Sequence, residues 1–70
     1  MINRKKVEMI KEIYPTGTKI ELDYMEDPQA VPPGTKGTVE YVDDIGQIHV
    51  KWENGSGLAL IYGVDHFHTI

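Results

Sequence analysis

The chain begins with apolar residues at helical spacing and continues with stretches in which apolar and polar residues alternate. The apolar stripe at the start consists of Val7, Ile10, Ile13 and Tyr14. Because its members are three and four positions apart and Asn3 is a favourable N-cap, we predict a short helix over about residues 3–12. Pro15 ends this helix, since the residue before a proline avoids helical dihedral angles.

The rest of the chain has the period of half-buried strands, in which every second residue is apolar. The predicted strands cover residues 18–24, 36–42, 48–52, 57–61 and 66–70. Strand 57–61 is apolar on both faces, so we expect it at the centre of the sheet or beneath the helix. The core-facing side chains are expected to be Ile20, Leu22, Val39, Tyr41, Ile48, Val50, Leu58 and Leu60.

Turn-forming residues separate these strands. Residues 25–35 contain three of the four prolines and no periodicity, so they form a long ordered loop. Within this loop, Pro33-Gly34 suits the centre of a type II turn. Asp43–Gly46 is expected to form a type I turn with glycine in the left-handed position, and Asn54-Gly55 a two-residue type I′ turn. Tyr62–Asp65 is typical of a tight turn or a single 3₁₀ turn.

These elements predict a mainly β fold, a five-stranded SH3-like antiparallel barrel with a short N-terminal α-helix. Residues 1–13 form the amphipathic helix and residues 14–70 the barrel, within a single domain overall. A chain of 70 residues buries only about 60% of its unfolded surface, so we expect one core. The absence of cysteine excludes disulfides, thiolate metal sites and a thiol nucleophile.

Several short motifs lie within Tyr14–Phe67: YPTGT at its start, then PPGTKGTV and VDDIGQIHVKW, and GVDHF at its end. On these motifs the chain resembles the bacterial and phage family known as domain of unknown function 4314. The resemblance implies an SH3-like barrel and frequent residence on mobile elements, and it implies no activity or functional residue. At Tyr62 the family pattern has proline, which bears on the geometry of that turn. The GTKGTV and VKWENG pieces are also similar to small barrels of the Mind-bomb, KOW and chromo-like type, which bind peptides or nucleic acid.

Charge is unevenly distributed along the chain. Residues 1–13 carry four basic and two acidic side chains, a balance of +2, whereas residues 14–70 carry three basic and nine acidic ones, a balance of −6. Clustered lysine and arginine bind a nucleic-acid backbone, so the acidic barrel disfavours nucleic acid as a partner. No apolar run reaches the roughly 18 residues of a membrane span, so we expect no membrane association and a cytoplasmic location.

Candidate residues for metal binding and catalysis are few. The histidine-centred group consists of His49, Asp65, His66 and His68. Two of these histidines project from the same side of a strand, and a third ligand could complete a zinc set. We nevertheless expect no metal and no cofactor, because cysteine and a helical HxxxH pair are both absent. The carboxylate pairs Glu26-Asp27 and Asp43-Asp44 are explained by turns, and Ser56 lies in a hairpin turn, so we expect no enzyme.

Aromatic side chains and the long loop are the predicted partner-binding features. The partner-binding residues are expected to be Tyr24, Met25, Glu26, Asp27, Trp52 and Tyr62. Aromatic rings form grooves for proline-rich peptides, and the loop combines an acidic pair, an exposed methionine and prolines. Each feature has an alternative interpretation. In the first, Trp52 packs in the core with its indole N–H at the rim. In the second, residues 25–35 cover the open barrel end with Met25 and Val31 packed inward.

We therefore expect a small non-enzymatic module that binds an unidentified protein or peptide through the 25–35 loop and neighbouring aromatics. One alternative is an acidic inhibitor or decoy from a mobile element, whose carboxylates occupy the cationic groove of a nucleic-acid enzyme. Another is a nucleic-acid adaptor in which the basic N-terminal helix makes the contacts. The sequence leaves these three functions open, together with the oligomeric state.

Overall fold

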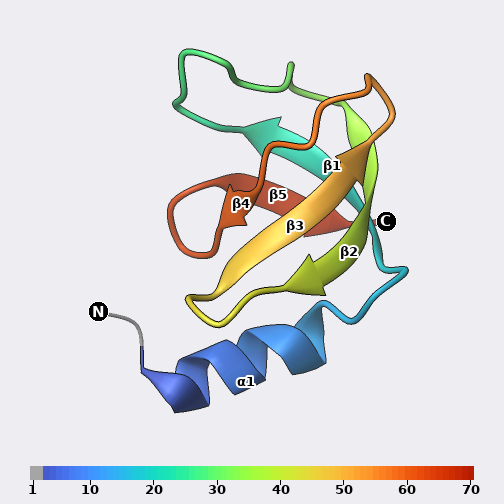
Figure 1. Ribbon diagram of the computed structural model, residues 1–70. Helices are drawn as coiled ribbons and strands as arrows, with labels where there is room; N and C mark the ends of the chain where they lie inside the picture. Colours follow the sequence, from blue (N-terminus) through green and yellow to red (C-terminus); the bar gives the residue numbers. More distant parts are fainter. Residues whose placement is uncertain (1–2) are drawn as a thin grey trace.

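The computed structural model describes residues 3–70 and contains one helix and five strands (Figure 1). The elements are α1 (Arg4–Ile13), β1 (Lys19–Tyr24), β2 (Lys36–Val42), β3 (Gln47–Trp52), β4 (Leu60–Ile61) and β5 (His66–Thr69). The strands form one antiparallel sheet in the order β4-β3-β2-β1-β5. The predicted mainly β fold with five antiparallel strands and a short helix is therefore confirmed. The sheet is not closed, so the word barrel describes it only loosely.

One hydrophobic core joins the sheet to the helix and to the long loop. It consists of Ile10, Ile20, Leu22, Met25, Val31, Val39, Val42, Ile48, Val50, Trp52 and Leu60. Six of the eight predicted core residues are among them, while Leu58 is only partly buried and Tyr41 is exposed. In Figure 1, α1 lies below one end of the sheet and the 25–35 loop lies at the opposite end. Both ends of the open sheet are thus covered.

Helix α1 begins and ends as its sequence predicts. The Asn3 Oδ1 atom accepts the backbone N–H of Lys6 at 2.8 Å, which satisfies one of the free N–H groups of the first turn. At the other end, the backbone N–H of Tyr14 donates to the carbonyl of Ile10, and Pro15 follows. The helix therefore has a defined cap at its start and a proline stop at its end.

The buried stripe of α1 is narrower than predicted. The buried residues of the helix are Val7 and Ile10. Ile13 is 47% exposed, so its predicted place in the stripe is wrong. Along an α-helix, a residue three positions further on is rotated by about 300° about the helix axis, which is about 60° short of a full turn. From Val7 to Ile10 to Ile13 these differences add up, so Ile13 points away from the sheet and Tyr14 takes its place. The Tyr14 ring centroid lies 5.2 Å from that of Phe67 in β5, which fixes the end of the helix on the sheet.

A β-bulge in β2 overturns the prediction for Tyr41. The register with β3 shifts between Val39 and Tyr41, which leaves Glu40 as an extra residue on β2. Because a bulge interrupts the alternation of faces, Tyr41 turns outward and is 53% exposed. Val42 enters the core in its place.

The same change of faces occurs at the end of β1. The register with β5 shifts between Leu22 and Tyr24, which leaves Asp23 as an extra residue. Tyr24 is 54% exposed, and Met25 is only 5% exposed. The prediction of an exposed methionine at position 25 is therefore wrong, because the shift points its side chain into the core.

The predicted strand 57–61 is reduced to Leu60–Ile61 and lies at an edge of the sheet rather than at its centre. The carbonyl of Leu58 accepts the indole N–H of Trp52 at 2.8 Å, and the backbone N–H of Leu58 donates to the Ser56 hydroxyl. The carbonyl and the N–H of Leu58 are therefore already bonded, and they are not available for the hydrogen bonds to β3 that a longer strand would make.

The turn at Asn54-Gly55 is not the predicted type I′ turn. Among residues 3–70 only glycines have a positive φ, so Asn54 lacks the left-handed conformation that type I′ requires. Gly55 has φ +88°, and its N–H donates to the carbonyl of Trp52. The predicted turn at Asp43–Gly46 is confirmed, with Gly46 at φ +84° and its N–H bonded to the Asp43 carbonyl. Both connections end in a left-handed glycine.

Residues 25–35 are anchored where they leave and rejoin the sheet. The backbone N–H of Leu22 donates to the carbonyl of Thr35 at 2.9 Å, and the Leu22 carbonyl accepts from Gly34 at 2.7 Å. The predicted type II turn is confirmed, since Gly34 has φ +87° and Thr35 N–H donates to the Pro32 carbonyl. Between these anchors, Met25 and Val31 are buried in the core. The arrangement matches the alternative in which the loop covers one end of the sheet.

We predict that Gly37→Ala lowers the free energy of unfolding by about 1–3 kcal/mol, as overpacking of a filled core does. Gly37 lies in β2, where an added Cβ would stand 2.5 Å from Val50 Cγ1 and 2.8 Å from Trp52 Cε3. Gly57→Ala is the matched control, because nothing lies within 4 Å of its Cβ position. Urea denaturation of the two variants measures the difference, and equal stabilities would contradict the packing around Gly37.

We also predict that Met25→Ala lowers the free energy of unfolding by about 2–5 kcal/mol, the usual cost of removing a buried large side chain. Glu26→Ala is the control, since this exposed neighbour should change stability by less than about 0.5 kcal/mol. Thermal or urea denaturation of both variants provides the measurement. A neutral Met25→Ala would mean that the loop does not close the core.

Candidate functional site

The predicted partner-binding residues are divided between the surface and the core. Tyr24, Glu26 and Asp27 are exposed next to one another at one end of β1. Met25 and Trp52 are buried, with 5% and 2% of their surfaces exposed. The alternative in which Trp52 packs in the core is confirmed, and its indole N–H reaches the Leu58 carbonyl.

Tyr62, the remaining predicted residue, is half-buried and lies on the helix side of the molecule. Its ring centroid is 6.3 Å from that of Tyr14, and the Lys6 Nζ atom stands 5.9 Å from the ring centroid. Tyr62 therefore helps to hold α1 on the sheet.

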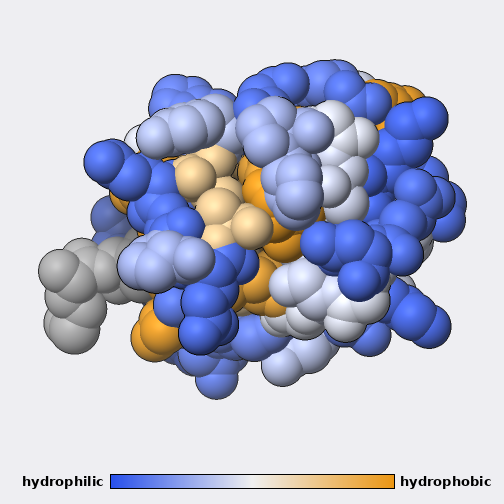
Figure 2. All heavy atoms as spheres, turned by 90° about the horizontal axis from the view of Figure 1, so that it is seen from above, coloured by the Kyte–Doolittle hydropathy of each residue, from blue (hydrophilic) through white to orange (hydrophobic). Residues whose placement is uncertain are grey.

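Figure 2 shows the end of the molecule at which the 25–35 loop lies. Apolar atoms occupy its middle, and hydrophilic side chains surround them. Met25 and Val31 of this loop have almost no exposed surface, so these two side chains belong to the core. Residues 26–30 and 32–34 of the loop are exposed, and they are mainly polar residues and prolines.

A groove lies where α1 gives way to β1, against the end of β2. It has a volume of about 310 Å³ and is lined by Lys11, Tyr14, Pro15, Thr16, Tyr41 and Val42. The Thr16 hydroxyl donates to the carbonyl of Glu40 at 2.7 Å, and the N–H of Gly17 donates to the carbonyl of Val39. These bonds fix the segment after Pro15 along β2 and so define one wall of the groove.

Tyr41 forms the opposite wall and is held in a fixed orientation. Its ring stacks on the imidazole of His49, with ring centroids 4.3 Å apart and an interplanar angle of 7°. The His49 Nε2 atom lies 2.8 Å from Asp43 Oδ2. Asp43 is itself held, since its Oδ1 accepts the backbone N–H groups of Ile45 and Gln47. The chain of contacts makes Tyr41 an exposed aromatic ring with little freedom to move.

The ionisation of Asp43 supports this arrangement. Partial burial alone would raise the pKa of its carboxyl, but the hydrogen bonds from His49, Gln47 and Ile45 together hold the pKa below its usual value. Asp43 is thus a carboxylate at neutral pH and accepts all three bonds. Across the groove, burial and the nearby Tyr62 raise the pKa of the Tyr14 phenol, which stays protonated and able to donate.

Charged side chains of both signs border the groove on the helix side. A second hollow of about 430 Å³ runs beside α1 and is lined by Arg4, Val7, Glu8, Lys11 and Asp44. Lys11 lines both hollows. Its Nζ lies 3.7 Å from Asp44 Oδ1, an exposed pair that contributes little to stability.

Over residues 3–70 no helix has the length and apolar character needed to cross a membrane.

The histidine-centred group considered from the sequence is not assembled. His49 contacts Asp43, whereas Asp65 accepts the backbone N–H of Ile61 at 2.8 Å. His68 lies instead beside Glu21 and Asp23 of β1. The sequence could not reveal this neighbourhood, because it depends on the register between β1 and β5.

The fold and the groove can now be compared with known proteins. No curated protein and no solved structure matches the chain. A family model described as Domain of unknown function (DUF4314) matches residues 3–70, which includes α1 as well as the sheet. Since the match spans nearly the whole chain, the protein belongs to the DUF4314 family.

Proposed function

We propose that the protein is a small non-enzymatic module that binds an extended segment of another protein in the groove between α1 and β2. The observation that carries this proposal is Tyr41, an exposed aromatic side chain fixed by His49 and Asp43 at the groove wall. Rigid exposed aromatic rings are the side chains that contribute most to binding at protein interfaces. The core does not use Tyr41, whose stacking on its cross-strand partner His49 stabilises the pairing of β2 with β3 and leaves the other side of the ring exposed.

The proposal keeps the function expected from the sequence and moves the contact surface away from the 25–35 loop. Two of the predicted partner-binding residues, Met25 and Trp52, are buried and therefore unavailable to a partner. The groove instead combines the exposed Tyr41 ring with Tyr14, Pro15 and Thr16. This set resembles the aromatic-lined grooves that hold extended peptides.

The chemistry of the groove favours a polyproline II segment as the ligand. Such a segment makes no internal hydrogen bonds, so its carbonyl groups are free to accept from the Tyr41 phenol. A proline or another compact apolar residue would pack against the exposed Tyr41 ring. Lys11 at the rim can exchange its exposed partner Asp44 for an acidic residue of the segment. A groove of about 310 Å³ accepts only a few side chains, which suits a weak, reversible contact.

Peptides selected on the wild-type protein from a random library displayed on phage should lose at least about tenfold in affinity with Tyr41→Ala, since exposed aromatic anchors contribute more than about 1.4 kcal/mol. Tyr24→Ala is the matched control, because its side chain is exposed to the same degree at the end of the neighbouring strand. Synthetic peptides and fluorescence anisotropy give the affinities. Failure to select any peptide would contradict the proposal. A loss with Tyr24→Ala or Glu26→Ala, but none with Tyr41→Ala, would place the site at the loop.

Asp43→Asn should lower stability at pH 7 by about 1 kcal/mol, because the amide loses the charge-assisted contact with His49. The pKa of Asp43 is lower in the folded protein than in the unfolded chain, so its contribution is complete above the unfolded value of about 3.9. It is lost as the pH falls through the lower folded value. The two proteins should therefore converge in urea denaturation at strongly acidic pH. A difference that is independent of pH would contradict the role of the carboxylate.

A further inference from the structure

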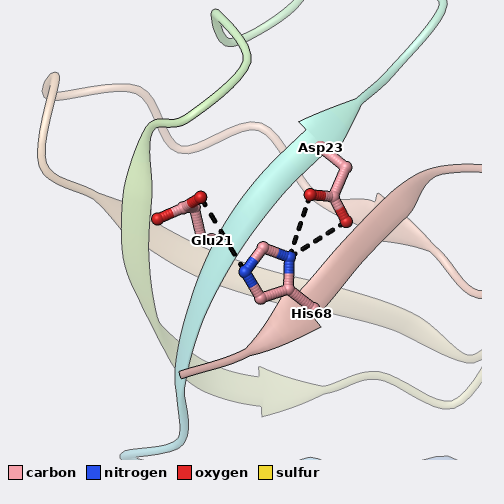
Figure 3. A group of neighbouring side chains, drawn as sticks. All are labelled: Glu21, Asp23 and His68. Atoms are coloured by element: carbon pink, nitrogen blue, oxygen red, sulfur yellow. Dashed lines mark hydrogen bonds and ion pairs between the residues drawn. The ribbon is translucent and has the colours of Figure 1, made fainter.

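Three potential metal ligands from two neighbouring strands lie together on the outer face of the sheet. They are Glu21 and Asp23 of β1 and His68 of β5 (Figure 3). Glu21 and His68 are paired directly across the two strands, and Asp23 follows two residues later on β1. Asp23 is also the extra residue at the shift of register, the kind of position at which bulges redirect side chains. Backbone pairing therefore holds the three side chains side by side.

The imidazole of His68 stands between the two carboxylates. Its Nδ1 lies 2.9 Å from Asp23 Oδ1 and 3.0 Å from Oδ2, and its Nε2 lies 3.8 Å from Glu21 Oε2. One ligand atom from each residue lies within 4.8 Å of the others. The hydrogen bond to Asp23 raises the pKa of His68, with the charges of Asp23 and Glu21 adding to the effect, while loss of hydration opposes it.

We propose that Glu21, Asp23 and His68 form a binding site for a divalent transition-metal ion, for which Zn²⁺ is the best chemical match. One imidazole nitrogen and two carboxylate oxygens are ligands that Zn²⁺ accepts at about 2.0–2.2 Å, with water in the remaining position. Mg²⁺ and Ca²⁺ prefer oxygen ligands alone, so the imidazole selects against them. The three side chains are partly exposed, so small rotations can bring their ligand atoms to these distances.

The position of the site determines what an ion would do there. The β5 strand is an edge strand, bonded on one side only, to β1. An ion bound by Glu21, Asp23 and His68 would cross-link these two strands and raise the stability of the pairing. Lys36 is paired with Glu21 across β1 and β2, and its positive charge opposes the binding of a cation nearby. We therefore expect a modest affinity, and binding that needs all three ligands.

Zinc chloride alone is the probe that tests this proposal, added to the full chain without a histidine tag in a non-coordinating buffer near neutral pH. Isothermal titration calorimetry should show one saturable site per chain, and NMR should show the His68 imidazole signals shifting on binding. Zinc should raise the melting temperature of the wild-type protein. His68→Ala and Asp23→Asn should each weaken binding at least about tenfold and remove the rise in melting temperature.

His66→Ala is the matched control, because His66 is an exposed histidine on the same strand outside the cluster. His49→Ala controls for the other histidine contact in the sheet, that with Asp43. Both variants should bind zinc as the wild type does. If His68→Ala does not fold, Glu21→Gln and Asp23→Asn carry the test. Absence of saturable binding at millimolar zinc would overturn the proposal, as would equal binding by His68→Ala or loss of binding with His66→Ala.

Discussion

Two β-bulges determine which side chains of this small protein enter its core. One leaves Asp23 as an extra residue on β1, and the other leaves Glu40 as an extra residue on β2. After each bulge a tyrosine turns outward and the next apolar residue turns inward. The inward residues are Met25 and Val42, and both belong to the single hydrophobic core. The shifts that complete the core therefore also place two tyrosine rings on the surface, and one of these rings forms the groove wall beside α1.

Much of the fold could be predicted because local signals determine it. Asn3 and Pro15 fix the ends of α1, and Gly34 and Gly46 occupy the turn positions that need a positive φ. The bulges could not be predicted, because apolar and polar residues go on alternating through Asp23 and Glu40 without interruption. Periodicity alone therefore placed Tyr41 in the core and left Met25 exposed. The short β4 had no local signal either, since it depends on the Trp52 indole taking the carbonyl of Leu58.

The candidate sites depended on tertiary structure even more strongly. Tyr14 and Tyr41 line one groove because the segment after Pro15 is bonded to β2, a contact between parts of the chain that share no sequence pattern. His68 and Asp23 are 45 residues apart and meet only through the register of β5 on β1. The relevant residue types, aromatics and histidines, are visible in the sequence. Which of them are neighbours is determined only by the tertiary structure.

The pairing of β5 with β1 also has a consequence for the synthesis of the protein. The β1 strand leaves the ribosome well before β5, so for that interval one of its edges has no partner strand. An unpaired strand edge is a site at which chains associate wrongly, and non-local pairing of this kind slows folding. Glu21 and Asp23 lie on this strand, and charged side chains on an edge oppose such association. The residues that face His68 in the folded protein are thus charged side chains of the kind that disfavour wrong pairing of β1 while β5 is absent.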